Sequence, residues 1–232
     1  LDYGNPNWKT FANAKKDIDE LGNYHRRQSN NSLMFWERPS WEELYSFMEM
    51  INNGGNGEPG LINGRLLREK APWAVGMNPC AEILLGDAGV CNLATIDLAK
   101  FKNDNIGLLK AAKLVTRANY RQTCVDFRDG ILQEKWHLNN DHLRLCGISV
   151  MGVAMRPDMS GHDFAMLQRT VTAAGFSIAK ELGTPYPKNL TTIKPEGTIS
   201  KCFDSTEGMH KPLGKYIFNN VAFSKYDPLV DK

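Results

Sequence analysis

The stretch that decides the fold is Met77–Leu98, MNPCAEILLGDAGVCNLATIDL. Its first part, N-P-C-A-E, places Cys80 between Asn78 and Glu82, and Cys91 follows just before a strand-like run. Proline has no backbone N–H and biases the residue before it away from helix, so we expect irregular backbone here. Because residues i and i+2 of an extended or loop backbone point the same way, the amide, the thiol and the carboxylate are predicted to form one row that faces one volume.

This row suits hydrogen exchange better than nucleophilic attack. A neighbouring carboxylate raises the pKa of a thiol and so disfavours the thiolate, whereas it can accept a proton from a bound substrate. A second cysteine nearby can supply reducing equivalents by thiol–disulfide exchange. We expect Gly86, Asp87 and Gly89 to form a tight return that brings Cys91 towards Cys80. The alternative is that both cysteines are simply small buried residues, as free cysteines usually are.

The combination of N-P-C-A-E-I with C-N-L resembles the catalytic large chain of ribonucleotide reductases. The short gap between the two cysteines is similar to the adenosylcobalamin-dependent (class II) branch, since the oxygen-dependent iron class usually has a longer one. The resemblance implies an α/β fold, here part of a ten-stranded α/β barrel with an internal finger loop. It implies Cys80 as the thiyl-radical cysteine at the tip of that loop, Glu82 as the base for the 3′-hydroxyl proton, and Asn78 as a hydrogen-bonding partner of the ribose. Cys91 would be one of the two reducing cysteines, with its partner upstream of this chain.

A second motif lies near the C-terminus, in Thr191–Ser200, TTIKPEGTIS. A β-branched run that ends in a Pro-Glu-Gly turn before a helix start presents free backbone N–H groups, and these bind phosphate without a large net charge. The alternative is an ordinary strand, turn and helix, with Thr198 or Ser200 as the N-cap. K-P-E-G-T-I-S resembles the substrate-phosphate turn of monomeric, triphosphate-type class II reductases. The residues that this resemblance assigns to the phosphate are Pro195, Glu196, Gly197, Thr198, Ile199 and Ser200.

Three further stretches are similar to the same family. R-R-Q-S-N-N-S, which ends at Ser32, is either a solvated polar loop or, by the resemblance, part of the substrate pocket, with Asn31 or Ser32 reaching a ribose or a phosphate. G-E-P-G within 52–60 is read as a turn before a helix; a phosphate-binding P-loop is excluded because G-x-x-x-x-G-K-[ST] is absent. R-L-C-G-I-S-V-M-G-V-A contains Cys146, which we interpret as a core residue.

Hydrophobic periodicity predicts the remaining elements. Ser40 and Glu43 form a predicted capping box, and the helix after them is expected to bury Leu44, Phe47, Met48 and Ile51. The predicted helices cover 7–21, 41–51, 61–69, 106–127 and 163–182. The buried stripe expected for the fourth helix is Leu109, Ala112, Val115, Ala118 and Tyr120. Cys124 is expected to pack on that same helix. The predicted strands cover 33–36, 143–150 and 216–224, with close backbone approach at Gly147 and Gly152.

Composition sets broad limits. The 232 residues are 42% hydrophobic and 23% charged, which is typical of a globular protein. A net charge of +2 gives no reason to expect binding to nucleic acid or to a membrane surface. No apolar run approaches the roughly 18–20 residues of a membrane-spanning helix, and the start lacks a signal peptide. Five cysteines without dense spacing suit a reducing compartment, so we expect a cytoplasmic protein.

The chain starts at Leu1 rather than at a methionine and stops at Lys232 without a cap, so we expect an internal fragment, with residues 1–232 forming one partial catalytic barrel domain. The resemblance implies radical reduction of ribonucleotides, triphosphates above all, to 2′-deoxyribonucleotides with adenosylcobalamin as cofactor. It further implies a thioredoxin-like or other dithiol reductant that acts through a C-terminal tail outside this chain, and effector-binding elements that lie mostly upstream. We expect the fragment alone to be inactive.

Other classes remain as alternatives. A glycyl-radical or iron-dependent reductase would share the barrel and the finger-loop cysteine. A structural metal-binding module would use Cys80, Cys91, Cys202 and His210, but these lack C-x-x-C spacing, so no metal site is predicted.

Overall fold

The computed structural model describes all residues except 56, 213, 217, 219–225 and 227–232. Within this part the chain mixes helices with short strands, which confirms the α/β class. The strands, which pair as β1–β2, β3–β4 and β5–β6, are β1 (Ser32–Phe35), β2 (Gly60–Asn63), β3 (Gly76–Met77), β4 (Leu84–Leu85), β5 (Asn92–Asp97) and β6 (Cys146–Met151). The α-helices are α1 (Trp8–Ala12), α2 (Ile18–Leu21), α3 (Trp41–Gly54), α4 (Gly64–Lys70), α5 (Asn105–Gln122), α6 (Glu134–Leu143), α7 (Gly161–Leu182) and α8 (Ile199–Cys202). The 3₁₀ helices are η1 (Tyr24–Gln28), η2 (Leu98–Phe101) and η3 (Val153–Met155).

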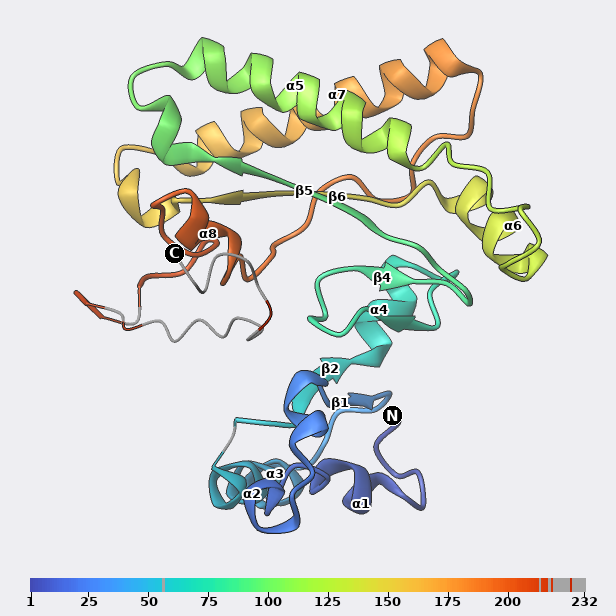
Figure 1. Ribbon diagram of the computed structural model, residues 1–232, viewed down its shortest axis with the longest axis vertical. Coiled ribbons are helices and arrows are strands. Elements are labelled where there is room, and N and C mark those ends of the chain that lie inside the picture. Colours follow the sequence, from blue (N-terminus) through green and yellow to red (C-terminus); the bar gives the residue numbers. More distant parts are fainter. Residues whose placement is uncertain (56, 213, 217, 219–225, 227–232) are drawn as a thin grey trace.

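The elements lie in three successive parts along the molecule (Figure 1). The N-terminal part holds α1, α2, α3 and the parallel pair β1–β2, the middle holds α4 and the antiparallel pair β3–β4, and the third part holds the parallel pair β5–β6 with α5 and α7. The largest core cluster lies in the third part, where α5 and α7 pack against β5 and β6. The Cys80 stretch therefore lies between two separately packed regions.

Several predictions for the N-terminal part are confirmed. The strand predicted at 33–36 is β1, and it pairs in parallel with β2. The capping box at the start of α3 is present, because Ser40 Oγ accepts from the Glu43 N–H at 3.2 Å while Glu43 Oε2 accepts from the Ser40 N–H at 2.8 Å. Phe47 is buried as expected, whereas the prediction for Met48 was wrong, since its side chain is exposed.

Two predicted helices differ from the observed ones. The helix expected over 7–21 is divided into α1 and α2, because Asp17 between them adopts a left-handed conformation with φ of 60° that an α-helix does not continue through. The helix expected from Leu61 starts only at Gly64, because residues 60–63 pair with β1 and form β2 instead. Tertiary pairing thus overrides the local helical pattern at this point.

The third part confirms most of its predicted elements. β6 is almost completely buried with Cys146 in the core, and α7 matches the helix predicted over 163–182. On α5 most of the predicted stripe is confirmed, since Ala112 and Tyr120 are buried and Leu109 and Val115 pack against the core cluster. Ala118 is the exception, because its side chain is exposed. The role predicted for Cys124 was wrong, because α5 ends at Gln122 and Cys124 is exposed.

Near the C-terminus the strand predicted within Thr191–Ser200 is reduced to one bridge between Thr191 and Ile148. The residues that follow run without a strand partner until α8. The strand predicted over 216–224 falls largely outside the described residues. In the described part of the chain, no helix is long and apolar enough to cross a membrane.

Gly147 joins the Cys80 stretch to the third part, as its predicted close approach suggested. A Cβ atom at this position of β6 would lie 2.5 Å from Leu93 Cδ2 of β5 and 2.9 Å from Ile83 Cδ1 of the stretch. Ile83 is fully buried in a cluster with Leu143 and Leu145. The absence of a side chain at Gly147 therefore lets the two regions pack closely.

We expect Gly147→Ala to lower the free energy of unfolding by about 1–3 kcal/mol, because the added methyl group overpacks this contact. Urea unfolding of the two proteins measures the difference. Gly161→Ala is the matched control, since no atom lies within 4 Å of a Cβ at the start of α7; it should change stability by less than about 1 kcal/mol, in the stabilising direction. Equal effects of the two substitutions would contradict the proposed contact.

Candidate active site

The loop that carries Cys80 is a closed turn between β3 and β4. The Asn78 N–H donates to the Ile83 carbonyl at 3.1 Å, and the Ile83 N–H donates to Asn78 Oδ1 at 2.9 Å. The Ala81 N–H donates to the Asn78 carbonyl at 2.9 Å, and Ala81 has a φ of 60°. The backbone is therefore not extended. The predicted row of Asn78, Cys80 and Glu82 assumed that alternate side chains point the same way, and this assumption was wrong, because the side-chain oxygen of Asn78 closes the turn.

Glu82 nevertheless lies close to both cysteines. Lost hydration around the sulfur is the largest cause that raises the pKa of the Cys80 thiol, and the Glu82 carboxylate is the next; a hydrogen bond from Asn30 opposes them. Burial and then Glu82 likewise raise the pKa of the Cys91 thiol. The Glu82 Oε2 atom is itself buried and makes no hydrogen bond within the described residues. Burial and the Glu82 carboxylate thus both favour the protonated form of the two thiols, which suits hydrogen transfer rather than thiolate attack.

The tight return that precedes Cys91 is present. The Gly89 N–H donates to the Gly86 carbonyl at 3.0 Å, and Cys91 follows directly before β5. Cys91 is half-buried, whereas Cys80 is exposed. The resemblance implies a sulfur inside a barrel; the described strands form three separate pairs rather than a closed barrel, so Cys80 is not enclosed by this chain.

The polar segment before β1 reaches the site through a residue that the sequence did not single out. Asn30 Nδ2 lies 3.6 Å from Cys80 Sγ. Asn31 is buried, and its Nδ2 donates to the Phe11 carbonyl at 3.3 Å, while Ser32 begins β1. The segment contains adjacent asparagines, and only the path of the chain decides which one faces Cys80.

The segment before the predicted phosphate turn also contacts the site. Thr192 Oγ1 donates to the Glu82 carbonyl oxygen. Lys194 Nζ donates to Thr95 Oγ1 at 2.8 Å, and Thr95 Oγ1 donates to Glu196 Oε1 at 2.6 Å. Thr95 lies on β5, four positions after Cys91. Thr192 and Lys194 lie in the second sequence motif but were assigned no role, and Thr95 was not singled out, because their partners are about a hundred positions away.

The predicted phosphate turn has both buried and exposed members. Glu196 is buried with its side chain directed to Thr95, and Ser200 is buried with its Oγ donating to the Gly197 carbonyl at 3.3 Å. Gly197, Thr198 and Ile199 are exposed at the start of α8. Within the described residues no backbone acceptor is recorded for the N–H groups of these three. The part of the motif that can offer donors to an anion is therefore the backbone of 197–199.

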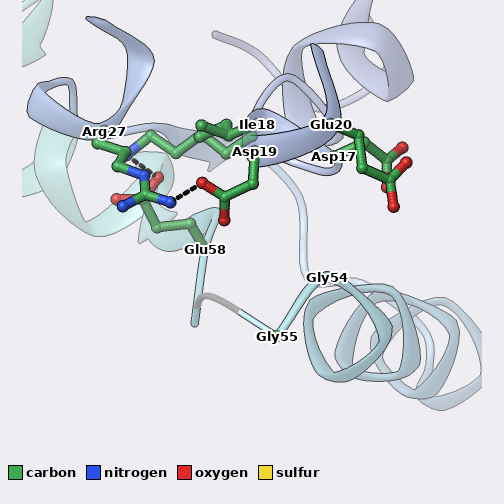
Figure 2. A pocket seen from close by; sticks show the side chains of 9 residues that line it. Asp17, Ile18, Asp19, Glu20, Arg27, Gly54, Gly55 and Glu58 are labelled. Carbon is green, nitrogen blue, oxygen red and sulfur yellow. Dashed lines mark hydrogen bonds and ion pairs between the residues drawn. The ribbon is translucent and has the colours of Figure 1, made fainter. Parts of the chain in front are cut away.

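Figure 2 shows a different cavity, of about 520 Å³, that none of the predicted site residues lines. Its charged groups are paired, since Arg27 bonds Asp19 and Lys15 lies 2.6 Å from Glu58, while Asp17 and Glu20 point away from Arg27. The residues that line it are Lys15, Asp17, Ile18, Asp19, Glu20, Arg27, Gly54, Gly55 and Glu58. In the described part of the chain, no group of three or more His, Cys, Asp or Glu residues is placed to hold a metal ion, so nothing there supports a metal-binding module.

The chain is similar in sequence to several known proteins. No family model matches the chain. It is 31% identical over 251 residues to a protein of Mycobacterium phage D29 described as an adenosylcobalamin-dependent ribonucleoside-triphosphate reductase, and the match covers 94% of this chain and 35% of that protein. It is 26% identical to the adenosylcobalamin-dependent ribonucleoside-triphosphate reductases of Lacticaseibacillus paracasei and Lactobacillus leichmannii, with 99% of this chain covered in both and 35% and 36% of those proteins.

Solved structures give the same result. A B12-dependent (class II) ribonucleotide reductase superposes with a TM-score of 0.69 at 25% identity, over 87% of this chain and 33% of that one. The α subunit of the class Id enzyme of Actinobacillus ureae shares the fold, with a TM-score of 0.56 at 16% identity over 83% of this chain and 46% of that one.

Fold and site thus define part of the α/β barrel of a ribonucleotide reductase. More narrowly, the chain belongs to the adenosylcobalamin-dependent, class II ribonucleotide reductases. It spans about a third of the length of the curated relatives that it matches. The family that the N-P-C-A-E and C-N-L motifs predicted is therefore confirmed.

We expect Glu82→Gln to lower the pKa of both the Cys80 and Cys91 thiols, because the substitution removes a negative charge that disfavours the thiolates. The rate of iodoacetamide alkylation, followed for each cysteine by peptide mass spectrometry across the range in which thiols ionise, measures this shift. The exposed Cys202 is the control and should react at the same rate in both proteins. If neither thiol changed its pH midpoint, Glu82 would not lie where the structure places it.

Proposed function

We propose that the complete protein reduces ribonucleoside triphosphates to 2′-deoxyribonucleotides with adenosylcobalamin as its cofactor. The observation that carries this proposal is the single carboxylate, Glu82, set beside two protonated thiols, Cys80 and Cys91. The relatives are named as ribonucleoside-triphosphate reductases, which supports the proposal and favours triphosphate over diphosphate substrates.

Cys80 has the properties that a hydrogen-transferring thiol needs. It is exposed, so a radical source and a ribose can both approach its sulfur, and the raised pKa keeps the S–H bond intact at neutral pH. Adenosylcobalamin supplies, when bound, the radical that removes this hydrogen atom. The resulting Cys80 thiyl then takes the 3′-hydrogen of the ribose and returns it at the end of the reaction.

Glu82 and Cys91 complete the chemistry on the ribose. Glu82 accepts the 3′-hydroxyl proton, which assists loss of the 2′-hydroxyl as water. Cys91 and a second cysteine outside this chain supply two protons and two electrons and end as a disulfide. One proton leaves with the 2′-hydroxyl as water, the other forms the new C2′–H bond, and Glu82 returns its proton to the 3′-oxygen. Asn78, whose Oδ1 closes the loop, retains its amide donor for the ribose, and Asn30 lies beside the same sulfur.

The turn of Pro195–Ser200 is proposed to hold the triphosphate. Its backbone N–H groups at 197–199 are the donors, because successive amides in a turn form a concave anion site without side-chain charge. The resemblance also assigned Asn31 and Ser32 to the substrate. We propose that these two residues hold Asn30 in position and do not bind the substrate directly.

The wider assignments follow from the family. We propose that residues 1–232 form one partial catalytic domain, and that the chain alone does not turn over because it supplies only Cys91 of the reducing pair. A thioredoxin-like or other dithiol would restore that pair through tail cysteines outside this chain. We further propose that the complete protein works in the reducing cytoplasm, which the use of free thiols favours.

The test is Cys80→Ser in the complete protein, assayed for deoxyribonucleotide formation with adenosylcobalamin and a dithiol. We expect activity to fall to background while nucleotide binding is retained, because an O–H bond is too strong to replace the S–H bond in hydrogen transfer. Cys202→Ser is the matched control and should remain active, since Cys202 is exposed and lies outside the proposed site. Turnover by Cys80→Ser, or turnover by the unmodified protein without adenosylcobalamin, would refute the proposal.

A further inference from the structure

The segment that runs from α7 into the phosphate turn contacts both parts of the proposed site. Thr192, Lys194 and Glu196 occupy alternate positions; the first contacts the loop of Cys80 and Glu82, and the other two contact β5, which directly follows Cys91. Ile193, between the first two, is 65% exposed. This alternation is what an extended backbone produces when one of its faces lies against the protein.

The first contact acts on the loop that carries Cys80. The Thr192 hydroxyl donates to the backbone carbonyl of Glu82 itself, so the position of that carboxylate depends on this bond. Among the described residues, the loop's other polar contacts are those of Asn78, within the loop, and the one from Asn30 Nδ2 to Cys80 Sγ. Thr192 is thus an anchor of the loop that comes from a distant part of the chain.

The second set of contacts acts on the phosphate turn. Glu196 is buried, adopts a left-handed backbone with φ of 59°, and is followed at once by Gly197. This conformation is uncommon for a residue with a Cβ, so it requires support from its surroundings. Thr95 Oγ1 donates to Glu196 Oε1, and Lys194 Nζ lies 3.3 Å from Glu196 Oε2. A buried carboxylate needs such partners to remain charged.

The segment is also held to the two strands of the third part, β5 and β6. Thr95 is on β5, the strand that Cys91 precedes, and Lys194 also donates its own backbone N–H to Ser149 Oγ of β6 at 3.0 Å. From Thr192 to Gly197 the chain advances five residues, which reach at most roughly 18 Å. The segment from Thr192 to Glu196 therefore limits how far the turn can lie from the Glu82 carbonyl.

We propose that Thr192, Lys194 and Glu196 are positioning residues, which together fix the distance between the Cys80–Glu82 loop and the turn that begins at Gly197. This inference rests on the proposed function, and it predicts different kinetic effects for substitutions of Thr192 and of Glu196. Thr192 governs the chemical step through Glu82, whereas Glu196, supported by Lys194, governs substrate affinity through the turn.

The first experiment uses Thr192→Val in the complete protein, which removes the hydroxyl and keeps the side-chain shape. We expect kcat to fall roughly tenfold with KM changed less than about twofold, the scale of one lost hydrogen bond. Thr192→Ser, which restores the donor, should return kcat to within about twofold of the unmodified value. Thr191→Val is the matched control, because no hydrogen bond from its hydroxyl is recorded in the described residues, and it should leave kcat unchanged. Equal losses in the two valine variants, or no rescue by serine, would overturn the role of Thr192.

The second experiment uses Glu196→Gln, which keeps the shape and removes the charge that pairs with Lys194. We expect KM for the ribonucleoside triphosphate to rise roughly tenfold with kcat changed less than about twofold, since the turn loses its support. Glu207→Gln is the matched control: Glu207 is also largely buried and ion-paired, with Lys201 at 2.7 Å, but its recorded partners do not include β5. A comparable rise in KM in Glu207→Gln, or a loss confined to kcat in Glu196→Gln, would overturn the role of Glu196.

A third readout does not depend on turnover, so it separates this inference from the proposed function. Alkylation of Cys80 and Cys91 against pH should shift towards lower pH in Thr192→Val, because the freed loop carries the Glu82 carboxylate away from the sulfurs. Inactive unmodified protein with this shift would refute the function alone. Active unmodified protein in which Thr192→Val changes neither the alkylation nor kcat would refute the positioning role alone.

Discussion

The constraint on which the structure depends is a carboxylate held beside two thiols. Glu82 has a buried oxygen without a hydrogen-bond partner in the described residues, and burial and then its charge raise the pKa of Cys80 and of Cys91. A buried carboxylate oxygen without a partner costs free energy, so the backbone that carries it needs support from other contacts. The closed turn of the Cys80 loop, the buried Ile83 and the bond from Thr192 together provide that support.

The fold supplies this support from several distant parts of the chain. β5 connects Cys91 to Thr95, β6 brings Gly147 against Ile83, and the segment after β6 returns to both the loop and β5. The helices α5 and α7 pack on β5 and β6 and form the largest core cluster, so these strands have a firm base (Figure 1). The chemistry is therefore placed at an edge of the best-packed region rather than within it.

Local signals predicted elements well where the signal lay within one element. The capping box of Ser40 and Glu43, the burial of Cys146 and the extent of α7 each depend on neighbours a few positions apart. Predictions were wrong where a distant partner decided the outcome. Residues 60–63 form a strand rather than the start of the predicted helix, because β1 pairs with them.

By itself the sequence determined the family and indicated the reacting groups that we propose, because N-P-C-A-E and C-N-L are contiguous and their chemistry depends on residue type. Only the tertiary structure decided which residues stand around those groups. Asn30 rather than Asn31 reaches Cys80, and Thr192, Lys194 and Thr95 link the loop to the phosphate turn. The physical reason is that a hydrogen bond requires two groups within about 3 Å, and for partners a hundred positions apart that proximity comes only from how the whole chain packs.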